Sequence, residues 1–75
     1  MNRTLQTLAS LITTRLKVPQ SIDSAHTLGD LGLDSFDIIL LVFDVEDHFQ
    51  IELPETAHPE RHTTVADLHE SIQAA

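Results

Sequence analysis

The chain has 75 residues, 41% of them hydrophobic, and it contains three phenylalanines but no tryptophan, tyrosine or cysteine. This length predicts a single domain over residues 1–75 with a small aliphatic core and little room for an enclosed active-site cavity. The absence of cysteine excludes disulfides, thiolate metal sites and a cysteine nucleophile. The formal net charge of −8 argues against nucleic acid as a partner, because the phosphate backbone would be repelled.

Charge and hydropathy are unevenly distributed along the chain. Residues 1–33 hold three cationic side chains and two carboxylates, whereas residues 34–75 hold ten carboxylates and one arginine. The second part should therefore attract basic protein surfaces. The N-terminus lacks the layout of a signal peptide, and the longest apolar run, residues 38–43, is far too short to span a membrane. We expect a soluble cytoplasmic protein, and the absence of linker-like ends predicts a discrete chain.

The first predicted element is an amphipathic helix over residues 3–16, followed by a connection over residues 17–33. The helix has apolar residues at intervals of three and four: Leu5, Leu8, Ala9, Leu11, Ile12 and Leu16. The connection is longer than most loops in compact domains and contains both glycines of the chain, Gly29 and Gly32. Its leucines should hold it against the core: Leu28, Leu31 and Leu33.

Residues 35–49 form the predicted central helix. A buried strand is the alternative for its apolar run, but the length and the spacing favour a helix. The inward face is predicted to consist of Ile38, Leu41, Val42, Val45 and Phe49. The opposite face is predicted to carry Asp37, Asp44 and Asp47. An apolar seam is left over, made of Phe36, Ile39, Leu40 and Phe43, and it either binds another molecule or contacts the long connection.

The remainder of the chain predicts a short link, a turn and a last helix. Residues 50–54 should be extended, and residues 55–58 allow about one helical turn before Pro59. Thr64 should cap the last helix, with Asp67 three residues on. Its inward face is predicted to be Val65, Leu68 and Ile72. The expected fold is therefore all-α, a small antiparallel bundle of three main helices plus one short helix.

Ser35 lies where the glycine-containing connection meets the central helix, in the run Gly32-Leu33-Asp34-Ser35-Phe36-Asp37. A serine nucleophile needs a base held by a third group, yet the nearest histidines are His26, across the connection, and His48, several turns along the helix. A helix start instead favours an attached anionic group by about 0.3–1 kcal/mol, although Asp34 and Asp37 would repel it. The pattern predicts a serine that another enzyme modifies. The alternative is that Ser35 only caps the helix.

The chain resembles the acyl carrier proteins over nearly its whole length. The resemblance rests on Leu28, the run Gly32-Leu33-Asp34-Ser35, the acidic and apolar second helix, Phe49 followed by Ile51, Leu53 and Pro54, and Thr63-Thr64-Val65. It implies an acyl-carrier-like fold and a 4'-phosphopantetheine arm, transferred from coenzyme A to Ser35 by a phosphopantetheinyl transferase. The thiol of the arm would hold an acyl group as a thioester. The chain itself would be a carrier without catalytic activity.

The resemblance also implies that partner enzymes dock on the second helix. We expect a monomer that presents its cargo to acyl-loading and acyl-processing enzymes of fatty-acid, polyketide or related biosynthesis. These enzymes would recognise carboxylates through basic surfaces and would also contact apolar residues beside the arm. The implied recognition residues are Asp34, Phe36, Asp37, Ile39, Leu40, Phe43, Glu46 and Asp47.

Three departures from the family pattern leave alternatives open. Phe36 replaces the leucine usual in fatty-acid carriers and is often found in carriers of D-alanine or other aminoacyl groups. Leu40 replaces a residue that is commonly acidic, and His62 replaces the apolar residue that usually precedes Thr-Thr-Val. The alternatives are an aminoacyl or D-alanyl carrier and a helical interaction module without a prosthetic group. His58 and His62 have a spacing that serves metals on a helix, but Pro59 interrupts it, so we expect no metal.

Overall fold

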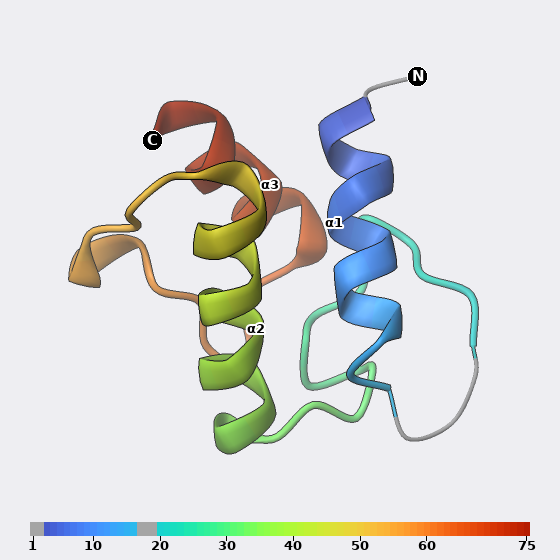
Figure 1. The fold of residues 1–75 in the computed structure, drawn as a ribbon. Coiled ribbons are helices and arrows are strands. Elements are labelled where there is room, and N and C mark those ends of the chain that lie inside the picture. Colours follow the sequence, from blue (N-terminus) through green and yellow to red (C-terminus); the bar gives the residue numbers. More distant parts are fainter. Residues whose placement is uncertain (1–2, 17–19) are drawn as a thin grey trace.

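The computed structural model describes residues 3–16 and 20–75, and these ranges form helices and connections without a β-strand. The elements are α1 (Arg3–Thr13), α2 (Ser35–Phe49), the short 3-10 helix η1 (Glu55–Ala57) and α3 (Val65–Ala74). α1 packs against both α2 and α3, and α2 runs antiparallel to α1 (Figure 1). The predicted all-α bundle of three main helices and one short helix is confirmed. No helix within the described ranges has the length and apolar character needed to cross a membrane.

α1 ends at Thr13, earlier than the predicted end at residue 16. The hydroxyls of Thr13 and Thr14 donate hydrogen bonds to backbone carbonyls of the preceding turn, at 2.8 and 2.7 Å. Side-chain bonds of this kind compete with the helical backbone, and β-branched residues favour a helix less than straight-chain ones. The two threonines therefore explain the early end. The centre of the predicted apolar face is confirmed by two fully buried residues, Leu8 and Ile12.

Leucines hold the long connection against the core, as predicted. Leu28, Leu31 and Leu33 are 0%, 2% and 1% exposed. Close to them, Gly32 has a φ of +86°, a left-handed conformation in which a side chain would be strained. Gly32 therefore allows the chain to turn sharply just before α2 begins.

A reciprocal pair of hydrogen bonds closes the turn in the middle of this connection. The Thr27 N–H donates to the Asp30 carboxylate and the Asp30 N–H donates to the Thr27 hydroxyl, each at 3.0 Å. The bond from the backbone of Thr27 is the main reason that the pKa of Asp30 lies below its ordinary value, and the Thr27 hydroxyl and nearby His26 act in the same direction.

The same connection is hydrogen-bonded to the segment that leads into α3. The Leu28 N–H donates to the Thr63 carbonyl at 3.0 Å, and the Gly29 N–H donates to the Arg61 carbonyl at 2.8 Å. Thr64 then caps α3 as predicted, because its hydroxyl accepts a hydrogen bond from the Asp67 N–H at 3.1 Å. The predicted inward face of this helix is also confirmed by three buried residues, Val65, Leu68 and Ile72.

α2 has the predicted bounds and nearly the predicted buried face. Ile38, Leu41, Val42 and Val45 are at most 5% exposed, and Phe49 is half-buried against the same core. The helix ends where Gln50 adopts a left-handed conformation with φ 56° and its N–H bonds back to the Glu46 carbonyl.

The acidic face of α2 differs from the prediction at Asp44. The Asp44 Oδ2 atom lies 2.7 Å from Nη2 and 2.8 Å from Nε of Arg15, and the two side chains are only 29% and 31% exposed. Asp44 therefore faces the end of α1, and of the three predicted outward carboxylates only Asp47 is exposed. The pattern within α2 alone does not reveal this, because Arg15 belongs to another part of the chain.

Candidate functional site

Ser35 is the first residue of α2, and its side chain is exposed. Asp34 is the N-cap: its carboxylate accepts from the Asp37 N–H at 2.9 Å, and its own N–H donates to the Asp37 carboxylate at 3.3 Å. This capping box leaves the Ser35 hydroxyl without a hydrogen bond to any residue that the structure describes. The alternative in which Ser35 itself caps the helix is therefore wrong.

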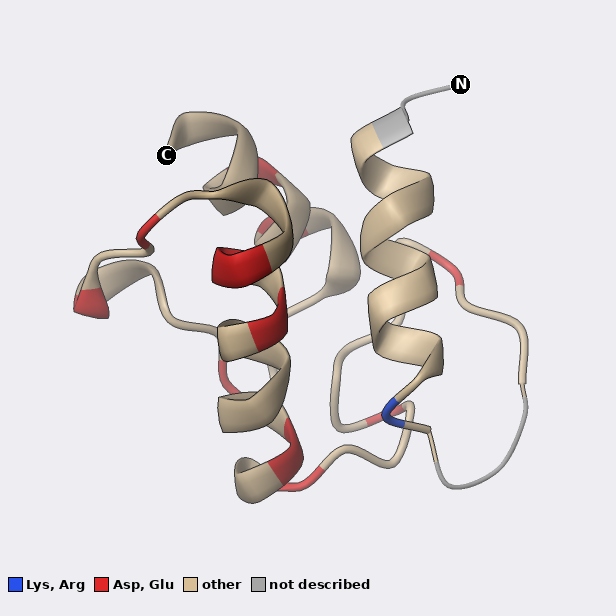
Figure 2. Cartoon of the chain, viewed as in Figure 1, with Lys and Arg blue, Asp and Glu red and all other residues tan. Residues whose placement is uncertain are grey.

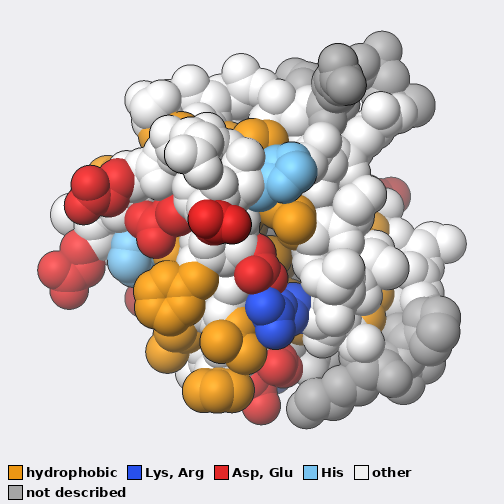
Figure 3. Space-filling model, viewed as in Figure 1, with side chains coloured by type: hydrophobic (Ala, Val, Ile, Leu, Met, Phe, Trp, Pro, Cys, Tyr) orange, Lys and Arg blue, Asp and Glu red, His pale blue; other side chains and the backbone are white. Residues whose placement is uncertain are grey.

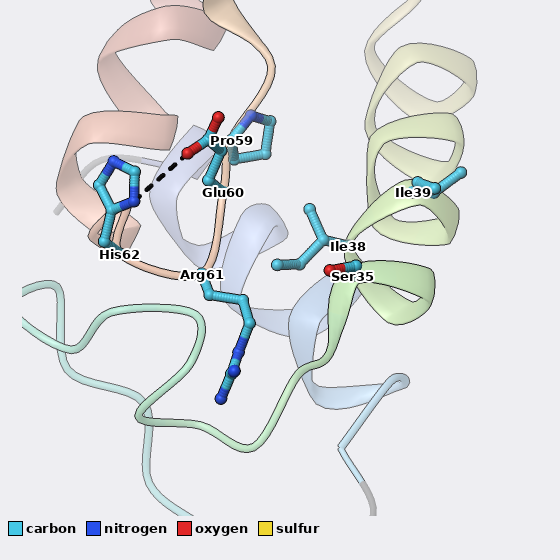
Figure 4. A pocket seen from close by; sticks show the side chains of 7 residues that line it. All are labelled: Ser35, Ile38, Ile39, Pro59, Glu60, Arg61 and His62. Atoms are coloured by element: carbon cyan, nitrogen blue, oxygen red, sulfur yellow. Dashed lines mark ion pairs between the residues drawn. The ribbon is translucent and has the colours of Figure 1, made fainter.

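A pocket of about 450 Å³ lies beside Ser35, between α2 and the segment that precedes α3 (Figure 4). The α2 side is contributed by Ser35 and two isoleucines, and the other side is mainly charged. Its lining residues are Ser35, Ile38, Ile39, Pro59, Glu60, Arg61 and His62. A smaller pocket of about 150 Å³ shares part of this lining and extends along α2 over apolar residues. It is lined by Ile38, Ile39, Val42, Phe43, His58 and Pro59.

The geometry at Ser35 does not form a catalytic triad. His62 shares the pocket with Ser35, but the neighbour of its Nδ1 atom is the Glu60 carboxylate at 3.4 Å, as the dashed line in Figure 4 shows. Within the described ranges no histidine or carboxylate is hydrogen-bonded to the Ser35 hydroxyl. A serine needs such a base to act as a nucleophile. The site is instead an accessible hydroxyl beside an open pocket.

The predicted apolar seam of α2 is largely exposed. Phe36, Ile39 and Phe43 are 67%, 52% and 60% exposed, while Leu40 is half-buried. Figure 3 shows hydrophobic side chains gathered over this side of α2, with acidic side chains around them. The interpretation that the seam only packs on the long connection is therefore wrong for these three residues, which we call the exposed patch. Such a patch on a small domain is typical of a surface that binds another molecule.

The predicted acidic recognition residues have different environments. Acidic residues follow α2 from its start to its end (Figure 2). Asp34 and Asp37 form the capping box, and Glu46 is half-buried and accepts a hydrogen bond from the Leu53 N–H at 2.9 Å. Asp47 is exposed, and its carboxylate has no hydrogen-bond partner among the described residues. Three of the four carboxylates thus also stabilise the fold.

Sequence reasoning did not identify the wall of the pocket that faces α2. Glu60 and Arg61 are far from Ser35 in the chain and belong to no motif around it. The backbone bonds between residues 28–29 and residues 61–63 bring them there. Only His62 stood out in the sequence, because a histidine replaces the apolar residue that usually precedes Thr-Thr-Val.

The histidine pair considered for a metal does not form a ligand cluster. His58 Nε2 lies 3.1 Å from the Leu53 carbonyl, and His62 neighbours Glu60. In residues 3–16 and 20–75 there is no group of three or more histidine or carboxylate side chains placed to hold a metal ion.

Comparison with known proteins defines the class of this site. The family model described as the phosphopantetheine attachment site matches residues 6–72. The acyl carrier protein AcpXL of Mesorhizobium japonicum is 32% identical over 56 residues, which are 72% of this chain and 60% of that protein. The mitochondrial acyl carrier protein of Neurospora crassa is 45% identical over 38 residues, which are 49% of this chain and 28% of that protein. The matches thus span less than two thirds of either relative.

These findings place the chain among proteins that carry phosphopantetheine. The chain belongs to the acyl carrier protein family. The prosthetic group of this family is 4'-phosphopantetheine, and its members are carriers without catalytic activity of their own. The predicted family and its cofactor are confirmed.

Proposed function

We propose that the chain carries an acyl group as a thioester on a 4'-phosphopantetheine arm attached to Ser35. The observation that carries the proposal is the exposed Ser35 hydroxyl, which makes no hydrogen bond within the described ranges and opens on the pocket beside α2. In the transfer, the Ser35 oxygen would form a bond to the phosphorus that bears the pantetheine. The pyrophosphate bond of coenzyme A would break and release adenosine 3',5'-bisphosphate, and the hydroxyl proton would leave to solvent.

The surroundings of Ser35 fit this group. The capping box places the Asp34 and Asp37 carboxylates on each other's backbone N–H groups, so the helix is capped without the serine side chain. The pocket offers an arginine for the phosphate and isoleucines for the chain that follows it. When bound, the arm supplies a thiol that this cysteine-free chain lacks.

Attachment is tested by intact mass. The purified full chain is incubated with coenzyme A and a broad-specificity phosphopantetheinyl transferase. We expect one phosphopantetheine to be added to the wild type and to Ser21→Ala, an exposed serine used as the matched control, and none to Ser35→Ala. Modification of Ser35→Ala, or no modification of the wild type, would contradict the proposal and favour an interaction module without a prosthetic group.

We further propose that the cargo serves fatty-acid, polyketide or related biosynthesis. The smaller pocket supports an acyl cargo, because it continues from the Ser35 pocket over apolar side chains, and each buried methylene contributes about 0.8 kcal/mol. The aminoacyl or D-alanyl alternative is supported by Phe36 next to Ser35. Treating the loaded protein with hydroxylamine cleaves a thioester to a hydroxamate, and the mass of that product distinguishes an aliphatic acyl group from an aminoacyl group.

Partner enzymes with basic surfaces are proposed to dock on α2. The exposed patch and the neighbouring carboxylates support this, since together they offer apolar contact and negative charge on one helix. The proposed recognition residues are Asp34, Phe36, Asp37, Ile39, Leu40, Phe43, Glu46 and Asp47. The electrostatic contribution to docking is tested by measuring how a phosphopantetheinyl transferase binds Asp47→Lys at low and at high salt. We expect weaker binding at low salt and a smaller salt dependence than for the wild type.

A further inference from the structure

Arg61 is a cation in an acidic region and has no side-chain partner among the described residues. It is the only lysine or arginine in residues 34–75, which hold ten carboxylates. Arg15 pairs with Asp44 at 2.7 Å, yet the Arg61 guanidinium makes no ion pair or hydrogen bond with any described residue. Glu60, the carboxylate that lines the same pocket, has His62 as its neighbour at 3.4 Å. The charge of Arg61 is therefore available to a ligand.

The fold sets the position of Arg61 through the backbone. Its carbonyl accepts the hydrogen bond from the Gly29 N–H at 2.8 Å. A Cβ atom at Gly29 would lie 3.1 Å from that carbonyl oxygen, 3.4 Å from the Arg61 Cβ and 3.5 Å from its Nε. The Arg61 side chain thus packs closely over Gly29, where a larger residue would make a tight contact with it. The backbone thus places Arg61 at the pocket, although no side chain within the described ranges binds its guanidinium.

Ser35 and Arg61 line opposite walls of one pocket. Figure 4 shows Ser35 at the start of α2, with its oxygen on the side toward the segment that carries Arg61. A phosphodiester on Ser35 would bring a negative charge close to Asp34 and Asp37, which are one and two residues away. The two carboxylates repel the negative charge of the phosphodiester, and the arginine that lines the pocket, Arg61, can offset this repulsion.

We propose that Arg61 binds the phosphodiester of the arm on Ser35 and so directs the arm along the pocket. The proposal rests on attachment at Ser35. Guanidinium donors match phosphate oxygens in pairs, and such charge-assisted bonds are about twice as strong as neutral ones. The arm is therefore positioned at its base, while its thiol end stays free to reach partner enzymes. Arg61 is a positioning residue for the prosthetic group.

The test compares the apo and holo forms of the full chain by NMR. The Nε–Hε signals of the arginines are recorded before and after attachment is verified by mass. We expect the Arg61 Hε signal to move downfield in the holo form, and the Arg15 signal, already bonded to Asp44 at 2.8 Å, to stay in place. An Arg61 signal that is the same in both forms would overturn the proposal. This measurement uses the wild type and does not depend on how a variant folds.

The phosphorus signal of the holo form provides a second readout. In Arg61→Gln we expect it to move toward the value of the urea-unfolded holo protein, and Arg61→Lys should lie between Arg61→Gln and the wild type. Glu60→Gln is the matched control, because it changes one charge in the same pocket but keeps the donor. A phosphorus signal that is identical in wild type and Arg61→Gln would overturn the proposal. A missing mass increase would instead refute attachment itself, so the two failures are distinguishable.

Discussion

A hydrogen bond to Glu46 joins α2 to the link that follows it, and the loss of this bond should lower the free energy of unfolding by a predictable amount. The Glu46 carboxylate accepts a hydrogen bond from the Leu53 N–H at 2.9 Å, and Leu53 is 3% exposed. In Glu46→Ala this buried N–H loses its partner, which costs about 1–3 kcal/mol. At about 0.05–0.15 kcal/mol per residue, a chain of this size has a free energy of unfolding of roughly 4–11 kcal/mol. The substitution therefore removes a large part of the stability.

The assay is urea unfolding followed by far-ultraviolet circular dichroism, supported by a thermal melt. A loss of 1 kcal/mol in a domain of about 60–100 residues lowers Tm by roughly 4–8 °C. Asp47→Ala is the matched control, because it removes the same charge at the next position from an exposed carboxylate without a partner in the described ranges. It should change the free energy of unfolding by less than about 0.5 kcal/mol.

Glu46→Gln separates the hydrogen bond from the charge. The amide oxygen still accepts from the Leu53 N–H, so we expect a smaller loss of stability than in Glu46→Ala. Equal free energies of unfolding for Glu46→Ala and Asp47→Ala would refute the reasoning. In that case the bond to Leu53 would not hold the link, and Glu46 would be an outward carboxylate only.

Three further experiments, which substitute five residues, test the core, the surface and the charges. Leu28→Ala should destabilise the fold by about 2–5 kcal/mol in urea unfolding, because Leu28 is 0% exposed. Phe43→Ala should cost less than about 1 kcal/mol, because Phe43 is 60% exposed. Similar losses in the two variants would contradict the assignment of Leu28 to the core and Phe43 to the surface. A double-mutant cycle on Arg15 and Asp44 should give a coupling of about 0.2–1 kcal/mol that shrinks in salt, and a salt-independent value would argue against an ion pair. Because Thr27 holds the pKa of Asp30 below its ordinary value of 3.8, the stabilisation by ionised Asp30 is complete above that pH and is lost as the pH falls through the lower folded value. The stability difference between wild type and Asp30→Asn should therefore shrink in acid, and a difference independent of pH would contradict this.

The elements of this fold could be predicted from the sequence because their signals are local. The spacing of Ile38, Leu41, Val42 and Val45 predicted both the bounds and the buried face of α2. Thr64 predicted the start of α3 through a bond that spans three residues. The end of α1 was placed too late, because the apolar spacing continues to Leu16 while threonine hydroxyls already compete for the helical carbonyls.

The features that could not be predicted depend on residues far apart in the chain. The pairing of Arg15 with Asp44 and the placement of Arg61 opposite Ser35 both follow from how the connections pack, and no pattern within one helix encodes them. The helix cap is an instructive intermediate case. Only Ser35 was considered as the cap from the sequence, although aspartate is equally favoured at this position, and in the structure the Asp34 carboxylate accepts the hydrogen bond from the Asp37 N–H.

The structural roles of the carboxylates decide how partner recognition can be measured. Asp37 closes the capping box and Glu46 holds the link after α2, so charge reversal at either residue should reduce stability as well as partner affinity. The sequence had indicated a recognition role for both carboxylates and had not indicated a structural one. Phe43 and Asp47 are exposed and make no such bonds among the described residues. Their substitution should leave the fold nearly unchanged. A loss of partner affinity would then report docking directly, with Phe43 testing the apolar contribution and Asp47 the electrostatic one.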